Sequence, residues 1–265
     1  MTSTIRHILL DIEGTTCPVS FVSEVLFPYA AREVSSYLAR HSRDSDIEEL
    51  LTELQTSWKK EDDPEAVALL RESGITGEAE PLQPVAKASP DPTDRATRLL
   101  PYIHWLIRRD IKLTAWKDLQ GRIWHEGYER GALRATLFPE VAATLRRWKQ
   151  LGFNLSVYSS GSVAAQQLLY GHSEDGDLRP LFSHWFDTRI GLKQEADSYR
   201  SILEILGCQP EQVLFISDSS AELLAAHACS FQVRFSDRPG NPDRNPSGFV
   251  SLQSLEELTL SPSAA

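Results

Sequence analysis

The chain has 265 residues, of which 41% are hydrophobic and 24% charged, and its formal net charge is −10 at pH 7. A chain of this length buries a sizeable core and can hold a domain with a second lobe inserted in it. The chain is acidic overall and lacks the clustered basic residues that nucleic-acid binding requires, so we expect no nucleic-acid partner. No apolar run approaches the roughly 18 residues of a transmembrane helix, so we expect no membrane partner.

The cysteine pattern indicates the compartment. The three cysteines are far apart in sequence and form no C-x-x-C pair. This pattern is typical of a reducing compartment, and the short N-terminal apolar run, which Asp11 interrupts, is unlike a signal peptide. We therefore expect a cytoplasmic protein. We also expect a monomer, because no long apolar helix face lacks an obvious partner within the chain.

The first predicted strand is a short apolar run at residues 8–10. It ends directly in two acids, Asp11 and Glu13, which a glycine and two threonines follow. A buried strand that ends in acid needs a reason, because carboxylates are costly to bury without a partner.

The next segment, residues 19–130, has almost no strand signal. Long amphipathic helical patterns dominate it, for example at 45–61 and 113–130. We predict a helical cap domain inserted after the first strand, over residues 19–130. Within it, residues 73–94 are rich in Pro, Gly, Ser and Ala, which predicts a mobile loop.

The remaining residues, 1–18 and 131–265, alternate strand and helix patterns. The helical pattern at 139–151 opens with a proline and is followed by a glycine, as helices commonly are. Further short apolar runs predict buried strands at 155–158, 213–216 and 231–235. This alternation predicts an α/β fold with a doubly wound parallel sheet and helices on both faces. The Pro- and Gly-rich stretch 236–248 follows the last of these strands and is expected to line a crevice.

Polar residues follow the apolar runs in the order Asp, Ser, Lys, Asp. Each residue alone has an ordinary alternative reading as a turn, a helix cap or a surface side chain. That each polar residue follows its own apolar run favours a shared functional site. The carboxyl ends of parallel strands meet at one edge of the sheet, where such sheets bind ligands. The inserted lobe also begins at this edge, which makes it a candidate lid. The residues are Asp11, Glu13, Ser159, Ser160, Lys193, Asp218 and Glu222.

The chemistry of this set suits a phosphoryl group. Two or three carboxylates at one place repel each other unless a cation lies among them, which suggests a hard divalent metal on oxygen ligands. Mg²⁺ fits best, because it takes few protein ligands and leaves positions for water and phosphate. Hydroxyls, backbone N–H groups and a lysine are the complementary set for an anion beside that metal.

The same residues carry a resemblance to a known family. Its features are D-x-[DE]-G-T at the first strand, a later serine, a lysine, and a late Asp that an acid follows four residues on. Together they resemble the haloacid dehalogenase-like superfamily of aspartyl phosphotransferases. Four stretches are more closely similar to the enolase-phosphatase family of methionine salvage: LLDIEGTTCPVSFVSEVLFPY, VYSSGSVAAQQLLYGHSEDGDL, FDTRIGLKQEADSYRSI and RPGN. The similarity covers both ends of the chain, whereas residues 41–95 match only in helical character.

The resemblance implies catalytic roles for two acids and a lysine. Asp11 would attack phosphorus and form an aspartyl phosphate, which splits one hard hydrolysis into two easier steps. Glu13 would donate a proton to the leaving oxygen and later activate water. Most of the superfamily has Asp at this position, so Glu13 is one methylene longer than the usual residue. Lys193 would stabilise the charge on the transferring group.

The resemblance also implies binding roles. One Mg²⁺ per chain would be held by Asp11, the backbone carbonyl of Glu13, and Asp218, with Glu222 completing its outer shell. The phosphoryl oxygens would be bound by Ser159, the amide of Ser160 and Lys193.

The implied reaction is that of a phosphoric monoester hydrolase in methionine salvage. The substrate, 2,3-diketo-5-methylthiopentyl-1-phosphate, is enolised and then dephosphorylated to the acireductone 1,2-dihydroxy-3-keto-5-methylthiopentene. Mg²⁺ or Lys193 would act as the electrophile at the C2 carbonyl.

The sequence does not identify the base that removes the proton from C1. We favour Glu13 for its reach, with Glu24 and His125 as rivals. An apolar pocket for the methylthio tail has five candidates, although each type of residue is more often part of the helix-packing core: Phe21, Phe27, Tyr29, Trp105 and Trp124.

Three other functions compete with this interpretation. A signalling receiver domain also phosphorylates an Asp on such a sheet, but it is about half as long and lacks a helical insertion. A haloacid dehalogenase needs no proton donor for a halide, so Glu13 argues against it. Against a related phosphatase acting on another small phosphomonoester, only the longer motif matches argue, and this alternative stays open.

Overall fold

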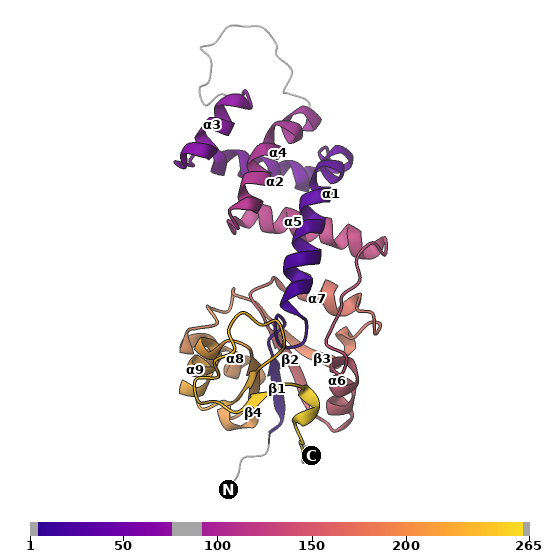
Figure 1. The fold of residues 1–265 in the computed structure, drawn as a ribbon, viewed down its shortest axis with the longest axis vertical. Helices are drawn as coiled ribbons and strands as arrows, with labels where there is room; N and C mark the ends of the chain where they lie inside the picture. The colour runs from indigo at the N-terminus through magenta and orange to yellow at the C-terminus, as the bar shows by residue number, and fades with distance from the viewer. Residues whose placement is uncertain (1–4, 76–91, 262–265) are drawn as a thin grey trace. The chain divides into compact units, whose positions relative to one another are not determined.

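The computed structural model describes residues 5–75 and 92–261 and is drawn in Figure 1. The chain divides into two compact units, one of residues Met1–Val25 with Tyr128–Ala265 and one of residues Leu26–Gly127. The cap boundaries at 19 and 130 stay a prediction. Most of the loop expected at 73–94 lies outside the described residues, and its last residues begin a helix.

The helices and strands follow one another in the described residues with these bounds. The first unit holds β1 (His7–Leu10), α6 (Val141–Gln150), β2 (Asn154–Tyr158), α7 (Val163–Gly171), β3 (Phe182–Phe186), α8 (Ala196–Leu206), β4 (Val213–Ser217), α9 (Ser220–Ala228), β5 (Gln232–Ser236) and β6 (Ser251–Leu252). The second unit holds α1 (Phe27–His41), α2 (Ser45–Trp58), α3 (Pro64–Glu72), α4 (Pro92–Arg108) and α5 (Thr114–Glu129). A short π-helix, Phe21–Leu26, leads from one to the other.

The six strands form one parallel sheet in the order β3-β2-β1-β4-β5-β6. The central strand β1 is buried along its whole length, as expected for a parallel sheet that is covered on both faces. Figure 1 shows α8 and α9 on one side of the sheet and α6 on the other. The predicted doubly wound parallel α/β fold is therefore confirmed.

One buried cluster of the first unit lies on the face of the sheet that α8 and α9 cover. Tyr199 of α8 packs edge-on against Tyr158 of β2, with ring centroids 5.7 Å apart, and against Phe231 at 5.6 Å. Leu9 and Phe215 belong to the same buried cluster. Each buried side chain of this size contributes about 1.5–3 kcal/mol of hydrophobic free energy, so this packing holds the strands in a fixed register.

Two strands of the sheet, β3 and β6, were not predicted from the sequence. β3 lies at the edge of the sheet, and its residues FSHWF mix polar and apolar side chains because only part of the strand is buried. β6 has two residues and pairs only with β5. Neither offers a continuous apolar run, which is the signal that marked the central strands.

The second unit is helical, as its amphipathic patterns predict. Trp58 at the end of α2 is fully buried; its ring stacks on Tyr102 of α4 at 4.9 Å, and its Nε1 donates to the carbonyl of Ala66 at 2.9 Å. Trp105 continues the stack, 5.6 Å from Tyr102. Among the residues with described positions, no helix is long and apolar enough to cross a membrane.

Candidate active site

The sheet register brings the polar strand ends to one level. Leu10 pairs with Val157 of β2 on one side and with Ile216 of β4 on the other. Asp11 follows β1 directly, and Ser159 and Asp218 follow β2 and β4 at nearly the same height. The predicted strand-end residues therefore come from three adjacent central strands.

Lys193 joins two of the predicted acids. Its Nζ lies 2.7 Å from Oδ1 of Asp11 and 2.7 Å from Oε2 of Glu222, and its side chain is only 8% exposed. Burial alone would lower the pKa of Lys193, but the charges of Asp11 and Glu222 outweigh it and hold that pKa above its ordinary value. The buried ammonium is therefore charged, and two carboxylates balance it.

The turn that carries Lys193 is fixed by the start of α8. Tyr199 donates its hydroxyl to the carbonyl of Lys193 at 2.6 Å, and Ser198 donates to that of Leu192 at 2.7 Å. The preceding Gly191 has a φ of 142°, and a Cβ on it would lie 2.1 Å from the Ser198 hydroxyl. Only glycine fits this close approach.

Asp11 is oriented by hydrogen bonds on both carboxylate oxygens. The backbone N–H of Ile12 donates to Oδ1 at 2.8 Å. The Ser217 hydroxyl lies 3.3 Å from Oδ2 and 2.8 Å from Oε2 of Glu222, and it accepts from the N–H of Ser219 at 3.1 Å. With one proton to give, the Ser217 hydroxyl serves one carboxylate at a time. Ser217 was not among the predicted site residues.

The loop after β1 is tightly folded around Gly14. The N–H of Gly14 donates to the carbonyl of Cys17 at 2.8 Å, which fixes the peptide that carries the Glu13 carbonyl. Gly14 has a φ of +67°, and a Cβ on it would lie 2.2 Å from Oδ2 of Asp218. The Asp218 carboxylate thus rests against the loop that holds Asp11 and Glu13.

Two of the crowded acids, Asp218 and Glu222, have raised pKa values. Burial, followed by the charges of Asp11 and Glu222, raises the pKa of Asp218 to about 7. Burial and the charge of Asp11 likewise raise the pKa of Glu222 to about 7. One ammonium serves several carboxylates, so Lys193 is paired with two of them while the acids keep an excess of negative charge. A divalent cation beside Asp11 and Asp218 would relieve this excess.

The donor set fits Mg²⁺ in its chemistry. Within residues 5–75 and 92–261, no group of three or more His, Cys, Asp or Glu side chains is arranged to hold a metal ion. The predicted set does not require one, because it takes two carboxylates, Asp11 and Asp218, and the backbone carbonyl of Glu13. Such a sparse oxygen set suits Mg²⁺, which keeps several waters.

The two predicted serines lie at the end of β2. Ser159 is buried; its N–H donates to the carbonyl of Phe186 at 3.2 Å, and its hydroxyl accepts from the N–H of Gly161 at 3.3 Å. Ser160 is exposed. The hydrogen bonds of Ser159 belong to its own turn and to β3, so its contact with a phosphoryl group stays a prediction.

The candidate bases differ in their placement. Glu13 is half-buried in the loop beside Asp11. Glu24 is exposed on the π-helix, and His125 is exposed on α5 of the second unit. Glu13 is held by its loop close to the carboxylate cluster, where its charge acts on Asp218.

The five aromatic candidates for the methylthio pocket divide into core and partly exposed residues. Phe21, Tyr29 and Trp105 are buried. Phe27 and Trp124 are less buried, and their rings stack 6.1 Å apart. Because Trp105 packs on Tyr102, we interpret it as part of the packing core of the second unit.

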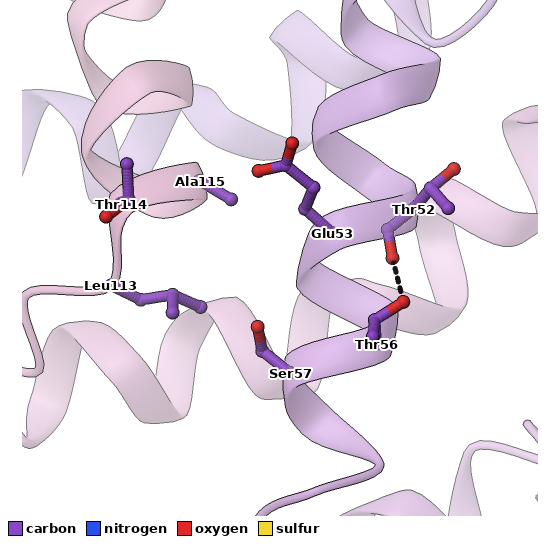
Figure 2. A pocket seen from close by; sticks show the side chains of 7 residues that line it. All are labelled: Thr52, Glu53, Thr56, Ser57, Leu113, Thr114 and Ala115. Carbon is purple, nitrogen blue, oxygen red and sulfur yellow. Dashed lines mark hydrogen bonds between the residues drawn. The ribbon is translucent and has the colours of Figure 1, made fainter.

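The second unit also has a hollow of about 330 Å³ between α2 and the start of α5, drawn in Figure 2. Threonine and serine hydroxyls line it together with Glu53 and Leu113. None of the predicted site residues or aromatic candidates lines this hollow.

Sequence reasoning missed three side chains that fix the Gly14 loop from the end of β5 and the stretch that follows it. Ser236 donates its hydroxyl to the carbonyl of Gly14 at 2.9 Å, and Asn241 donates Nδ2 to the same carbonyl at 3.0 Å. Arg238 is buried and donates to the carbonyl of Thr15 at 3.2 Å. The motif RPGN, which contains Arg238 and Asn241, was the signal that pointed to this stretch.

Comparisons with known proteins identify the family to which the chain is similar. A family model described as a haloacid dehalogenase-like hydrolase matches residues 5–230. Enolase-phosphatase E1 of Synechococcus sp. (strain RCC307) is 46% identical over 97% of this chain and 95% of that protein. Enolase-phosphatase E1 of Parasynechococcus marenigrum (strain WH8102) is 43% identical over 96% of this chain and 98% of that protein. The crystal structure of the UTR4 protein of Saccharomyces cerevisiae has a TM-score of 0.73 and 29% identity, over 96% of this chain and 100% of that one.

Proposed function

The chain belongs to the enolase-phosphatase family of haloacid dehalogenase-like hydrolases, and from this premise we propose that it is the acireductone synthase of methionine salvage. It enolises 2,3-diketo-5-methylthiopentyl-1-phosphate and hydrolyses the phosphate ester, releasing 1,2-dihydroxy-3-keto-5-methylthiopentene. We further propose that it uses one Mg²⁺ per chain and acts as a cytoplasmic monomer.

One observation carries the proposal beyond family membership. Lys193 lies 2.7 Å from both Asp11 and Glu222 in a buried cluster at the carboxyl ends of the strands. A buried ammonium between carboxylates, with a further acid of raised pKa beside them, supplies both a nucleophile and the positive charge that a phosphate ester requires.

Asp11 acts as the nucleophile in the phosphatase reaction. One of its carboxylate oxygens attacks phosphorus, and the bond between phosphorus and the ester oxygen of the substrate breaks. Glu13 gives its proton to the leaving oxygen. Glu13 then takes a proton from water, whose oxygen attacks the aspartyl phosphate and releases inorganic phosphate and free Asp11.

Lys193, Ser159 and the amide of Ser160 bind the phosphoryl oxygens in this proposal. Lys193 is fixed by its buried backbone and by two carboxylates, so its charge is already oriented before the substrate binds. Mg²⁺ would be held by Asp11, the Glu13 carbonyl and Asp218, and when bound it neutralises charge between nucleophile and phosphate.

The enolisation precedes hydrolysis and needs a base at C1. We propose Glu13 for this role, because the Gly14 loop fixes it beside Asp11 and its side chain is one methylene longer than Asp. The base takes a proton from C1, and Lys193 stabilises the charge that develops on the C2 oxygen; a bound Mg²⁺ would be the alternative source of this positive charge.

The test follows both half-reactions in one anaerobic cuvette. Purified protein with Mg²⁺ and the diketo phosphate is expected to show enol ultraviolet absorbance and release of phosphate. Asp11→Asn is expected to release no phosphate, because its amide cannot form the aspartyl ester.

Two results would contradict the proposal in different ways. Phosphate release from generic phosphomonoesters without either signal from the diketo phosphate would leave a related phosphatase with another substrate. Phosphate release by Asp11→Asn at the wild-type rate would exclude Asp11 as the nucleophile.

A further inference from the structure

The side chain of Asn241 has a fixed amide orientation. It is 7% exposed, and its Nδ2 donates to the carbonyl of Gly14 at 3.0 Å and to the carbonyl of Ser236 at 3.1 Å. Both amide hydrogens are therefore used on carbonyl oxygens, which assigns Nδ2 and Oδ1 without ambiguity. Oδ1 must point away from both carbonyls.

Oδ1 of Asn241 is buried and has no hydrogen-bond partner in the part of the chain that the structure describes. It lies 2.8 Å from the position that a Cβ on Gly14 would take, and Oδ2 of Asp218 lies 2.2 Å from the same position. Two acceptor oxygens therefore approach one place, and the described residues offer the amide oxygen no donor. An unpaired buried acceptor costs about 1–3 kcal/mol, so a donor from outside the chain is expected there.

We propose that Asn241 is a positioning residue of the magnesium site, in which Oδ1 accepts a hydrogen bond from a water in the hydration shell of an ion held by Asp218. The inference rests on the proposed Mg²⁺ dependence. A neutral acceptor suits this place, because Mg²⁺ keeps several waters that need acceptors, and another carboxylate would add to the existing repulsion.

A simpler role for Asn241 would be to hold the Gly14 carbonyl. Ser236 offers a matched control, because its hydroxyl donates to the same carbonyl at 2.9 Å. Removing the Ser236 hydroxyl takes away one donor to Gly14 and leaves Oδ1 of Asn241 in place. The two variants therefore separate the support of the loop from the contact with the hydration shell.

The experiment is a calorimetric titration of the full chain with MgCl₂ in the absence of substrate. Asn241→Ala is expected to bind Mg²⁺ about 10-fold more weakly than the wild type, as loss of an outer-shell partner does. Ser236→Ala is expected to keep the wild-type Kd. Asn241→Asp, which retains an acceptor oxygen, is expected to bind more tightly than Asn241→Ala.

Three outcomes would overturn the inference. If Asn241→Ala keeps the wild-type Kd, Oδ1 does not act on the metal. If Asn241→Ala and Ser236→Ala weaken binding equally, Asn241 only supports the Gly14 loop. If the wild type itself binds no Mg²⁺, the metal requirement of the proposed function fails together with this inference. Thermal unfolding checks that each variant folds, and Asn241→Ser carries the same expectation as Asn241→Ala should the latter not fold.

Discussion

Nζ of Lys193 lies 2.7 Å from Oδ1 of Asp11, so the turn before α8 is joined to the end of β1 by a buried ion pair. The same ammonium reaches Glu222 of α9 at the same distance. Three segments that are distant in sequence therefore meet at one charge, and the proposed nucleophile, Asp11, is oriented by an interaction that is also structural.

Replacing Lys193 by Met is expected to lower both activity and stability. Without the ammonium, Asp11 and Glu222 stay buried and uncompensated, which costs about 3–5 kcal/mol of unfolding free energy. Loss of a preorganised charge at the phosphoryl group should reduce phosphate release by about 100-fold or more. Urea unfolding and a phosphate assay measure the two effects. Lys117→Met, at an exposed position on α5, is the control and should change neither.

A methyl group at Gly14 is expected to damage the metal site. Gly14 and Gly131 both have a φ near +70°, but a Cβ would lie 2.2 Å from Asp218 in the first and meet nothing within 4 Å in the second. Gly131→Ala should cost only the backbone strain, about 1–2 kcal/mol. Gly14→Ala should cost more, and it should also weaken Mg²⁺ binding, because Asp218 must move. Equal unfolding free energies and equal Mg²⁺ affinities for the two variants would show that Asp218 is not held against the loop.

Shortening Glu13 to Asp is expected to suppress enolisation. The carboxylate then falls one methylene short of C1, whereas we expect the leaving oxygen to stay within its reach. The enol absorbance should therefore drop more than phosphate release from a simple phosphomonoester. Glu13→Gln, which cannot transfer a proton, should lose about 100- to 10,000-fold in both.

Two control variants test the rival bases. Glu24→Gln and His125→Gln are expected to keep the enol signal. A normal rate of enolisation in Glu13→Asp, or its loss in either control, would move the base away from Glu13.

The metal-free protein is expected to lose stability as the pH rises. The pKa of Asp218 is raised to about 7 in the folded state from its ordinary value of 3.8, so between these pH values the folded protein binds a proton that the unfolded chain has already released. This contribution is fully present below about pH 4 and is lost as the pH rises through about 7. Asp218→Asn removes it, so the unfolding free energy of the variant relative to the wild type should rise between pH 5 and pH 8. Urea unfolding in EDTA measures the difference.

Added Mg²⁺ should reverse this trend. The ion binds the deprotonated carboxylates, so its stabilising effect on the wild type should be larger at pH 8 than at pH 5. An effect of Mg²⁺ that is the same at both pH values would argue that Asp218 is not a ligand.

Much of the fold was readable from the sequence because its signals are local. The central strands β1, β2, β4 and β5 are short apolar runs, and the helix at 139–151 has its own start and stop residues. The edge strands β3 and β6 gave no such signal, because they are half-exposed or very short, and neighbouring strands rather than their own residues hold them in the sheet.

The same distinction applies to the candidate site: some of its residues could be predicted from local sequence, and other contacts only from the tertiary structure. Asp11, Ser159 and Asp218 could be named in advance, because each polar residue directly follows an apolar run and the carboxyl ends of parallel strands share an edge. The contacts of Asn241 with Gly14, which lie 227 positions apart, and of Arg238 with Glu140 at 2.5 Å could not. No periodicity or motif spacing encodes such pairs. The contact of Asn241 forms because the folded sheet brings the loop after β5 against the loop after β1, where buried carbonyls must find donors.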